Sequence, residues 1–288
     1  MSDLPTILSR GDSLIAAELR PPRTELDPAA GMETWIDTYH AVRGLARLGT
    51  FTFLTDGAVG AHEEDNLRHL VANLGDDVPR DRVVPFLTTK HTLDYCLNYA
   101  DRAWHAGFRS LVVLGGDSTV GPPRVVPHGS DLRRLVRARQ PGLALGGWAN
   151  PHVAADVQIE YLLDRDICAD FFLTQIVSHH DTAAVERFLG EAARRQLTLV
   201  SVFGIFYYRS ANPVTLRLLS RFLPVPTTAL TEEFAVGTSA VEICARSVAM
   251  LRRVGVRHLY ISNLPTGSAA TTLKAILKRA EEIEALRL

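Results

Sequence analysis

Short apolar runs alternate with amphipathic segments along most of the chain. Eight runs rich in β-branched and apolar residues are expected to form strands that are buried on both faces. They cover residues 14–19, 51–55, 82–88, 110–115, 143–147, 171–175, 198–204 and 258–262. The sequence thus predicts a sheet whose strands are separated by longer connections.

The segments between these runs have the periodicity of helices that bury one face. Apolar residues at helical spacing, with glycines as end signals, predict helices over 33–48, 67–74, 93–104, 131–139, 156–166, 182–194, 213–222 and 269–286. One extra helix is expected over 239–253, between the seventh and eighth strands.

Eight successive strand–helix units predict a (β/α)8 TIM barrel that occupies residues 1–288 as a single domain. The length is close to the roughly 250 residues typical of this fold. An open, doubly wound sheet is the rival architecture. The first strand–helix connection has no glycine-rich dinucleotide fingerprint, which favours the barrel.

Composition narrows the class of protein. With 47% hydrophobic residues, disorder is unexpected, and no apolar run is long enough for a membrane span. The 31 basic and 32 acidic side chains nearly cancel, which disfavours nucleic acid as a partner. The three cysteines form no CxxC pair, and the N-terminus lacks a secretory signal. We therefore expect a cytoplasmic protein, and the sequence leaves its oligomeric state open.

Polar and aromatic residues gather where the predicted strands end, which is where barrel enzymes place their active sites. Glu18 lies in the apolar segment Ala16-Ala17-Glu18-Leu19. Burial would raise the pKa of this carboxyl group and suit it to general acid catalysis. The alternative is a structural glutamate that bonds to a neighbouring backbone group.

Two further strand ends carry candidate binding groups. Asp117 follows Gly115 and Gly116, which permit a close backbone approach to a ligand. Gln175 can donate and accept hydrogen bonds at once, which suits the edge of a heterocycle. A turn-capping aspartate and a satisfied amide at the barrel rim are the respective alternatives.

Two other groups of residues are expected to be structural. The pair His179-His180 has no third histidine or carboxylate at ligand spacing apart from the following Asp181, so loop histidines are favoured and no metal site is predicted. Arg133 and Arg134 are expected on a solvated helix face.

Several of these positions lie in segments that resemble the methylenetetrahydrofolate reductase family. Glu18-Leu-Arg-Pro-Pro-Arg-Thr24 resembles the family's Phe-Glu-Phe-Phe-Pro-Pro-Lys-Thr, and Thr55-Asp-Gly-Ala58 resembles its Thr-Tyr-Gly-Ala. The other similar segments are Leu114-Gly-Gly-Asp117, Leu173-Thr-Gln175, Gly204-Ile205 and Tyr260-Ile-Ser-Asn263. Their shared order covers nearly the whole chain.

The resemblance implies reduction of 5,10-methylenetetrahydrofolate to 5-methyltetrahydrofolate by NAD(P)H. It assigns Glu18 as the general acid that protonates the folate amine, and Asp117 and Gln175 as folate-binding residues. It places Thr55, Gly116, Trp148, His152 and also Asp117 at the cofactor.

The chain departs from the family at the FAD contacts. Phe86 replaces a histidine, Gly115 replaces an arginine, and Leu163-Asp-Arg-Asp166 stands where the family offers a lysine to the FAD phosphates. An aspartate there has the wrong charge for a diphosphate. We therefore expect weak or absent FAD and direct hydride transfer from NAD(P)H, with NADH favoured. FAD bound through altered contacts is the alternative.

Two other functions are compatible with the same residues. A folate-dependent methyltransferase would keep Asp117 and Gln175 and need no hydride. A non-catalytic folate-binding subunit would keep the barrel after loss of the flavin.

Overall fold

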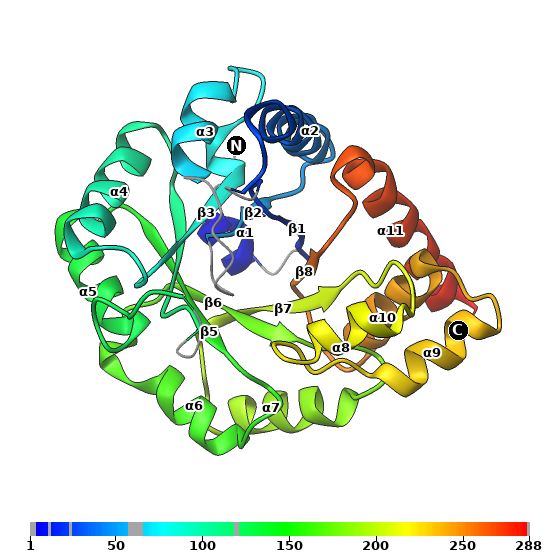
Figure 1. Ribbon diagram of the computed structural model, residues 1–288. Coiled ribbons are helices and arrows are strands. Elements are labelled where there is room, and N and C mark those ends of the chain that lie inside the picture. The colour runs from blue at the N-terminus through cyan, green and yellow to red at the C-terminus, as the bar shows by residue number, and fades with distance from the viewer. Residues whose placement is uncertain (1–3, 11–12, 23–24, 57–65, 118–120, 287–288) are drawn as a thin grey trace.

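Eight parallel strands form a closed barrel in chain order (Figure 1). The computed structural model describes residues 4–10, 13–22, 25–56, 66–117 and 121–286. The strands are β1 (Ile15–Leu19), β2 (Thr52–Leu54), β3 (Val83–Thr88), β4 (Ser110–Leu114), β5 (Ala144–Ala149), β6 (Phe171–Ile176), β7 (Val200–Phe206) and β8 (Leu259–Ser262). β1 pairs with both β2 and β8, so the predicted barrel is confirmed and the open sheet is excluded.

A ring of helices surrounds the barrel. It contains α2 (Pro28–Arg47), α3 (Asn66–Asn73), α4 (Leu93–His105), α5 (Gly129–Arg139), α6 (Ala155–Leu163), α7 (Thr182–Arg194), α8 (Pro213–Leu219), α9 (Thr227–Ala235), α10 (Ala240–Arg253) and α11 (Ala269–Ala285). Short 3-10 turns are η1 (Arg80–Arg82), η2 (Arg165–Ile167) and η3 (Thr266–Ser268). The helix expected over 156–166 ends at Leu163, and η2 follows it.

Three helices, α8, α9 and α10, lie between β7 and β8. The sequence predicted α8 and the extra helix α10 but not α9. Leu230 is the buried residue that α9 contributes to the core, so this helix lacks the repeating apolar stripe on which the prediction depends.

Local sequence signals explain where several helices begin and end. The Asp27 carboxylate accepts hydrogen bonds from the backbone N–H groups of Ala29 and Ala30, and Pro28 occupies the first helical position of α2. At the other end, Gly49 has a φ of 73°, a left-handed conformation that glycine adopts without strain.

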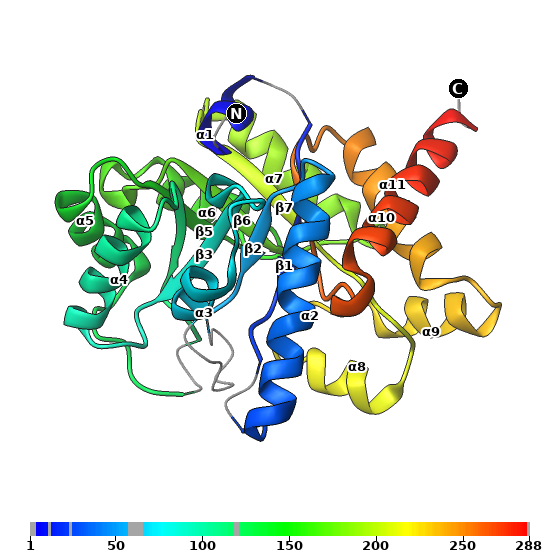
Figure 2. The same ribbon diagram turned by 90° about the horizontal axis from the view of Figure 1, so that it is seen from above.

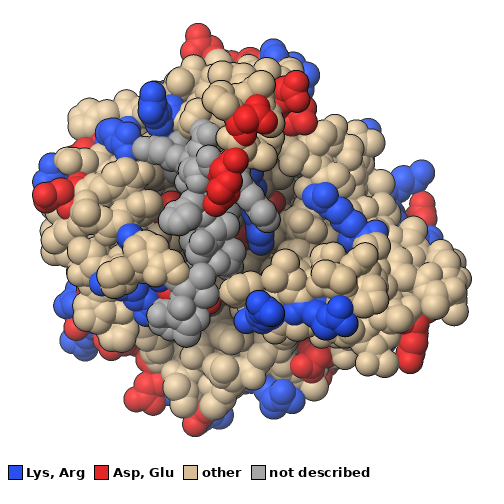
Figure 3. Space-filling model, in the orientation of Figure 1, with Lys and Arg blue, Asp and Glu red and all other residues tan. Residues whose placement is uncertain are grey.

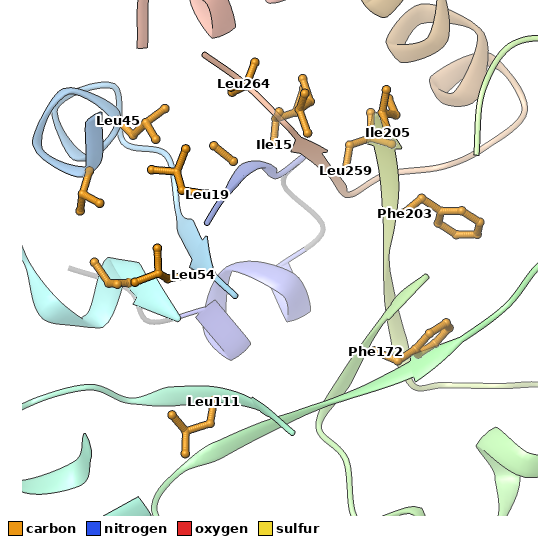
Figure 4. Close-up of a cluster of buried hydrophobic side chains, with 14 of the residues drawn as sticks. Ile15, Leu19, Leu45, Leu54, Leu111, Phe172, Phe203, Ile205, Leu259 and Leu264 are labelled. Carbon is orange, nitrogen blue, oxygen red and sulfur yellow. The ribbon is translucent and has the colours of Figure 1, made fainter. Parts of the chain in front are cut away.

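The core has two layers because alternate residues of a strand point to opposite faces. Ile15 and Leu19 of β1 point outward and pack under the helices with Leu45 of α2 (Figure 4). Ala16 points into the barrel, where it belongs to a second cluster with Phe53 of β2 and others. An inward-pointing side chain near the end of a strand therefore faces the barrel mouth.

The barrel is closed at one end by α1 (Leu4–Arg10), a helix that the sequence analysis did not predict. Leu4 and Leu8 are buried and belong to the inner cluster. Figure 2 shows α1 at the end of the barrel opposite to α8. The apolar floor formed by α1 leaves the other end available for a site.

Parts of two resemblance segments, namely Arg23, Thr24, Gly57 and Ala58, lie outside the described residues. Among the helices that the structure describes, none combines the length and the apolar composition needed to cross a membrane.

Candidate functional site

A pocket of about 670 Å³ opens at the carboxyl ends of the strands. Six of the seven predicted site residues line it, namely Glu18, Thr55, Gly116, Asp117, Trp148 and Gln175. This volume lies within the roughly 300–1,000 Å³ range of small-molecule sites. The structure thus brings together residues that are far apart in the sequence.

Strand parity explains this convergence. Glu18 follows Ala16 by two residues in β1, and Gln175 follows Leu173 by two in β6. Ala16 and Leu173 belong to the inner core cluster, so the polar residues after them also face the lumen.

Glu18 is half-buried at the seam between β1 and β8. The hydroxyl of Ser262 donates a 2.6 Å hydrogen bond to Glu18 Oε1. Burial raises the pKa of the Glu18 carboxyl, and this effect exceeds the lowering by Ser262 and by the charge of Arg20. Glu18 therefore keeps its proton to a higher pH than an exposed glutamate, as a general acid requires.

Tyr260 lies beside Glu18 in the lumen. Its hydroxyl donates a 2.7 Å hydrogen bond to the carbonyl of Thr174. Burial and the charge of Glu18 raise the pKa of Tyr260 well above its ordinary value. The phenol stays neutral, so Tyr260 acts as a fixed wall of the pocket.

The amide of Gln175 has a fixed orientation. Gln175 Nε2 donates to the carbonyl of Phe222 at 3.2 Å, and Gln175 Oε1 accepts from the backbone N–H of Ile176 at 2.9 Å. Phe222 and Leu223, between α8 and α9, also line the pocket. Gln175 thus joins the barrel rim to the insertion between β7 and β8.

Asp117 follows a backbone turn that needs glycine. Gly116 has a φ of 69°, and a Cβ atom there would lie 3.0 Å from side-chain carbons of Lys90. The Gly116 carbonyl accepts a 2.5 Å hydrogen bond from Arg124 Nη2. Lys90 and Arg124 thus pack against the turn that places Asp117 at the pocket.

The predicted cofactor residues fall into two groups. Thr55, which directly follows β2, and Trp148 of β5 line the pocket. His152 does not line it. The Nε2–H of His152 donates to the carbonyl of Ile176 at 2.8 Å, which places this residue behind the wall formed by Ile176.

Arg133 corrects the expectation of a solvated helix face, because only 1% of it is exposed and it lines the pocket. Its guanidinium donates to the carbonyls of Ile167 and Val113, each at 2.8 Å, and to the Tyr161 hydroxyl at 3.1 Å. Gly129 leaves space beside it, since a Cβ atom there would lie 3.3 Å from Arg133 Nη1.

The acceptors of Arg133 are all neutral. Among the described residues, no carboxylate forms an ion pair with it. A buried cation without a counter-ion is costly and favours an anionic ligand. Two further arginines, Arg20 and Arg124, line the pocket together with the carboxylates of Glu18 and Asp117.

The acidic segment at residues 163–166, which the resemblance would place at the flavin phosphates, contributes neither Asp164 nor Asp166 to the pocket. Asp164 caps η2 through a hydrogen bond from the Asp166 backbone N–H, and neither Asp164 nor Arg165 is a lining residue. Figure 3 views the molecule from the same side as Figure 1 and shows Lys and Arg side chains over α8.

Sequence reasoning gave no site role to several polar and aromatic lining residues, among them Arg20, Arg124, Arg133, Tyr260 and Ser262. Tyr260 and Ser262 are two residues apart in β8, so both side chains point into the barrel. This alternation could have been recognised in the sequence. Leu132 and Val136 are buried on the same helix as Arg133, but their spacing alone does not indicate that an arginine beside them is buried.

Comparisons with known proteins give the fold. No family model matches the chain, and no curated protein matches it in sequence. A solved structure described as an uncharacterized protein from Clostridium thermocellum that binds two copies of 5-methyl-5,6,7,8-tetrahydrofolic acid is similar, with a TM-score of 0.64 and 16% identity. The match covers 98% of this chain and 99% of that one.

A second similar structure is an F420-dependent secondary alcohol dehydrogenase in complex with an F420-acetone adduct. Its TM-score is 0.54 at 10% identity, with 93% of this chain and 99% of that chain covered. Both likenesses support the barrel fold.

Proposed function

We propose that this chain is a methylenetetrahydrofolate reductase-like oxidoreductase that reduces 5,10-methylenetetrahydrofolate to 5-methyltetrahydrofolate with NAD(P)H. The observation that carries the proposal is Glu18, a carboxyl group with a raised pKa inside a pocket of about 670 Å³. The fold likeness to a protein that binds 5-methyltetrahydrofolate supports the folate as ligand.

The reaction needs one proton and one hydride. The protonated Glu18 gives its proton to the folate amine nitrogen as the five-membered ring opens to the iminium ion. The hydride from the nicotinamide then adds to the methylene carbon, which gives the methyl group and NAD(P)+. Solvent reprotonates Glu18, so atoms and charges balance over one turnover.

Other lining residues have binding roles in this proposal. Asp117 and Gln175 hold the pterin ring, since a carboxylate accepts from its N–H groups and the amide can donate as well as accept. Thr55, Gly116 and Trp148 border the nicotinamide. His152 supports the wall through Ile176.

The arginines of the pocket suit the anionic parts of these substrates. Arg133 and Arg124 lie on the side of the pocket formed by α5 and the loop after β4. A guanidinium binds phosphate or carboxylate oxygens through paired N–H donors. We assign Arg133 and Arg124 to the diphosphate of NAD(P)H.

The residues with which the family contacts the FAD phosphates have no counterparts among the described residues that line the pocket of this chain. The Asp164 side chain caps η2 outside the pocket. Phe86 lines the pocket at the position where the family has a histidine. We therefore derive no step through a flavin.

An anaerobic reaction of flavin-free protein with NADH and methylenetetrahydrofolate tests the proposal. The expected result is loss of NADH absorbance matched by formation of 5-methyltetrahydrofolate. Activity that strictly follows a bound flavin chromophore would overturn direct hydride transfer. A matched pair of variants tests the acid: Glu18→Gln should lose about 10²–10⁴-fold in rate, whereas the exposed Glu33→Gln should keep full activity.

Two rival functions give different results in the same experiment. A methyltransferase consumes 5-methyltetrahydrofolate only with a methyl acceptor and does not oxidise NADH. A folate-binding subunit binds the folate without turnover. The structural neighbour's binding of 5-methyltetrahydrofolate is the observation that keeps both rivals in the test.

A further inference from the structure

A second cluster of polar side chains lies outside the pocket, where the loop after β6 meets the insertion between β7 and β8. His179 and His180 belong to that loop, and Glu233 belongs to α9. One ligand atom from each of the three residues lies within 4.8 Å of the others. The sequence predicted loop histidines without a metal, because Glu233 is distant from them in the chain.

The donor atoms have the spacing of a metal site. His179 Nε2 lies 3.3 Å from Glu233 Oε1, and His180 Nε2 lies 3.0 Å from Glu233 Oε2. A tetrahedral zinc ion with bonds of about 2.0–2.2 Å holds its nitrogen and oxygen ligands roughly 3.3–3.5 Å apart. The observed separations differ from this geometry by a few tenths of an ångström at most.

Each histidine also has a serine behind it. His179 Nδ1 lies 2.8 Å from Ser247 Oγ, and His180 Nδ1 lies 3.3 Å from Ser178 Oγ. Ligating histidines bond through the second ring nitrogen to an outer group, which fixes the ring and its tautomer. With each Nδ1–H donating to a serine oxygen, both Nε2 lone pairs face the carboxylate, and a cation between them stabilises that arrangement.

The Glu233 carboxylate is shared with an arginine, and that arginine also binds a second glutamate. Arg246 Nη1 donates to Glu233 Oε1 at 3.0 Å, and Arg246 Nε donates to Glu242 Oε1 at 3.0 Å. Glu242 also pairs with Arg279. A carboxylate oxygen can accept from a guanidinium with one lone pair and bind a metal with the other, as ligating carboxylates commonly do.

We propose that His179, His180 and Glu233 form a binding site for a divalent transition-metal ion, with zinc as the ion that suits two imidazoles and a carboxylate. Water completes the coordination, since the three side chains are each 13–16% exposed. The site is independent of the reductase proposal.

The position of the cluster gives the ion a structural role. It joins the loop after β6 to α9, and Ser247 extends the connection to α10 (Figure 1). Gln175 at the end of β6 also contacts Phe222 before α9. A bound ion would therefore hold the insertion that walls one side of the pocket.

Calorimetric titration of the chelator-treated full chain with Zn2+ tests this proposal. The expected result is one ion per chain and a melting temperature that rises with Zn2+ concentration, because the ion binds the folded state. Glu233→Gln should abolish both effects. Ser247→Ala removes only an outer group and should weaken binding about 10–100-fold.

The neighbouring Glu232→Gln provides the matched control, because Glu232 is exposed on the same helix and the charge change is identical. It should bind Zn2+ as the wild type does. No binding by the wild type, or equal binding by wild type and Glu233→Gln, would overturn the proposal. The cluster would then be a histidine–glutamate–arginine network held by hydrogen bonds alone.

Discussion

The role proposed for Glu18 opposes the contribution of this carboxyl group to the stability of the folded chain. Burial raises its pKa above the value of 4.5 that it has when exposed. The folded chain therefore holds a proton that the unfolded chain has released. Stability from this group is complete below about pH 4.5 and is lost as the pH rises toward the folded pKa.

Glu18→Gln should therefore be more stable than the wild type at neutral pH while it loses activity. The difference in melting temperature should grow as the pH rises above 4.5, because only the wild type must then either keep a proton that the unfolded chain releases or carry a buried charge. Thermal unfolding at several pH values measures this. A variant that is less stable than the wild type throughout that range would contradict the assignment.

Ser262→Ala should shift the pH dependence of the reaction upward. The Ser262 hydroxyl donates to Glu18 and favours its ionised form, so removal of the hydroxyl raises the pKa of Glu18 further. The alkaline limb of the kcat/KM profile should move to higher pH. The exposed Ser268→Ala is the control and should leave the profile in place.

At this scale the sequence could predict residues whose environment is set by their own strand. Glu18 was identifiable because a carboxylate in an apolar strand needs an explanation. Arg133 was not, because its burial depends on room left by Gly129 and on carbonyls of Val113 and Ile167, which only the folded chain brings together.

At the scale of elements, β7 needs a glycine where an aromatic ring crosses it. A Cβ atom at Gly204 would lie 2.5 Å from Tyr260 ring atoms, and the Tyr260 hydroxyl is held by the Thr174 carbonyl. The ring therefore cannot move away without loss of that bond.

Gly204→Ala should destabilise the chain by about 1–3 kcal/mol through overpacking. It should also reduce activity, because Tyr260 borders Glu18. Chemical denaturation and turnover measure the two effects. The control is Gly190→Ala in α7, where no atom lies within 4 Å of the added Cβ and helix propensity predicts a gain of roughly 0.5–1 kcal/mol. Equal effects at both sites would refute the clash.

The strands were predictable as elements because a buried parallel strand is apolar on both faces. Most helices were predictable from their apolar stripes. α9 and α1 are short, and α1 contributes only Leu4 and Leu8 to the core, so neither shows a sustained period. Their positions depend on contacts with the completed barrel rather than on their own sequence.

At the scale of the whole molecule, the two ends of the barrel differ in composition. α1 seals one end with apolar side chains, and the other end carries the polar pocket. Stability and catalysis should therefore respond to changes at different ends.

Leu8→Ala should lower the free energy of unfolding by about 2–5 kcal/mol, because Leu8 is 4% exposed and its truncation leaves a cavity. The KM for the folate should not change, because Leu8 is not among the residues that line the pocket. Denaturant unfolding and steady-state kinetics provide the two measurements. Met32→Ala, at a residue 59% exposed on α2, should change neither quantity; a changed KM in Leu8→Ala would show that the ends are coupled.

The hydrogen bond between Glu18 and Ser262 spans 244 residues of sequence and joins the first strand to the last. During synthesis Glu18, the proposed proton donor, emerges near the start, but its partner Ser262 emerges only when the chain is almost finished. A chain with seven strands in place would hold most of the secondary structure and still lack the catalytic environment. If the chain has the proposed activity, turnover should therefore appear last in refolding and should report the closure of the barrel.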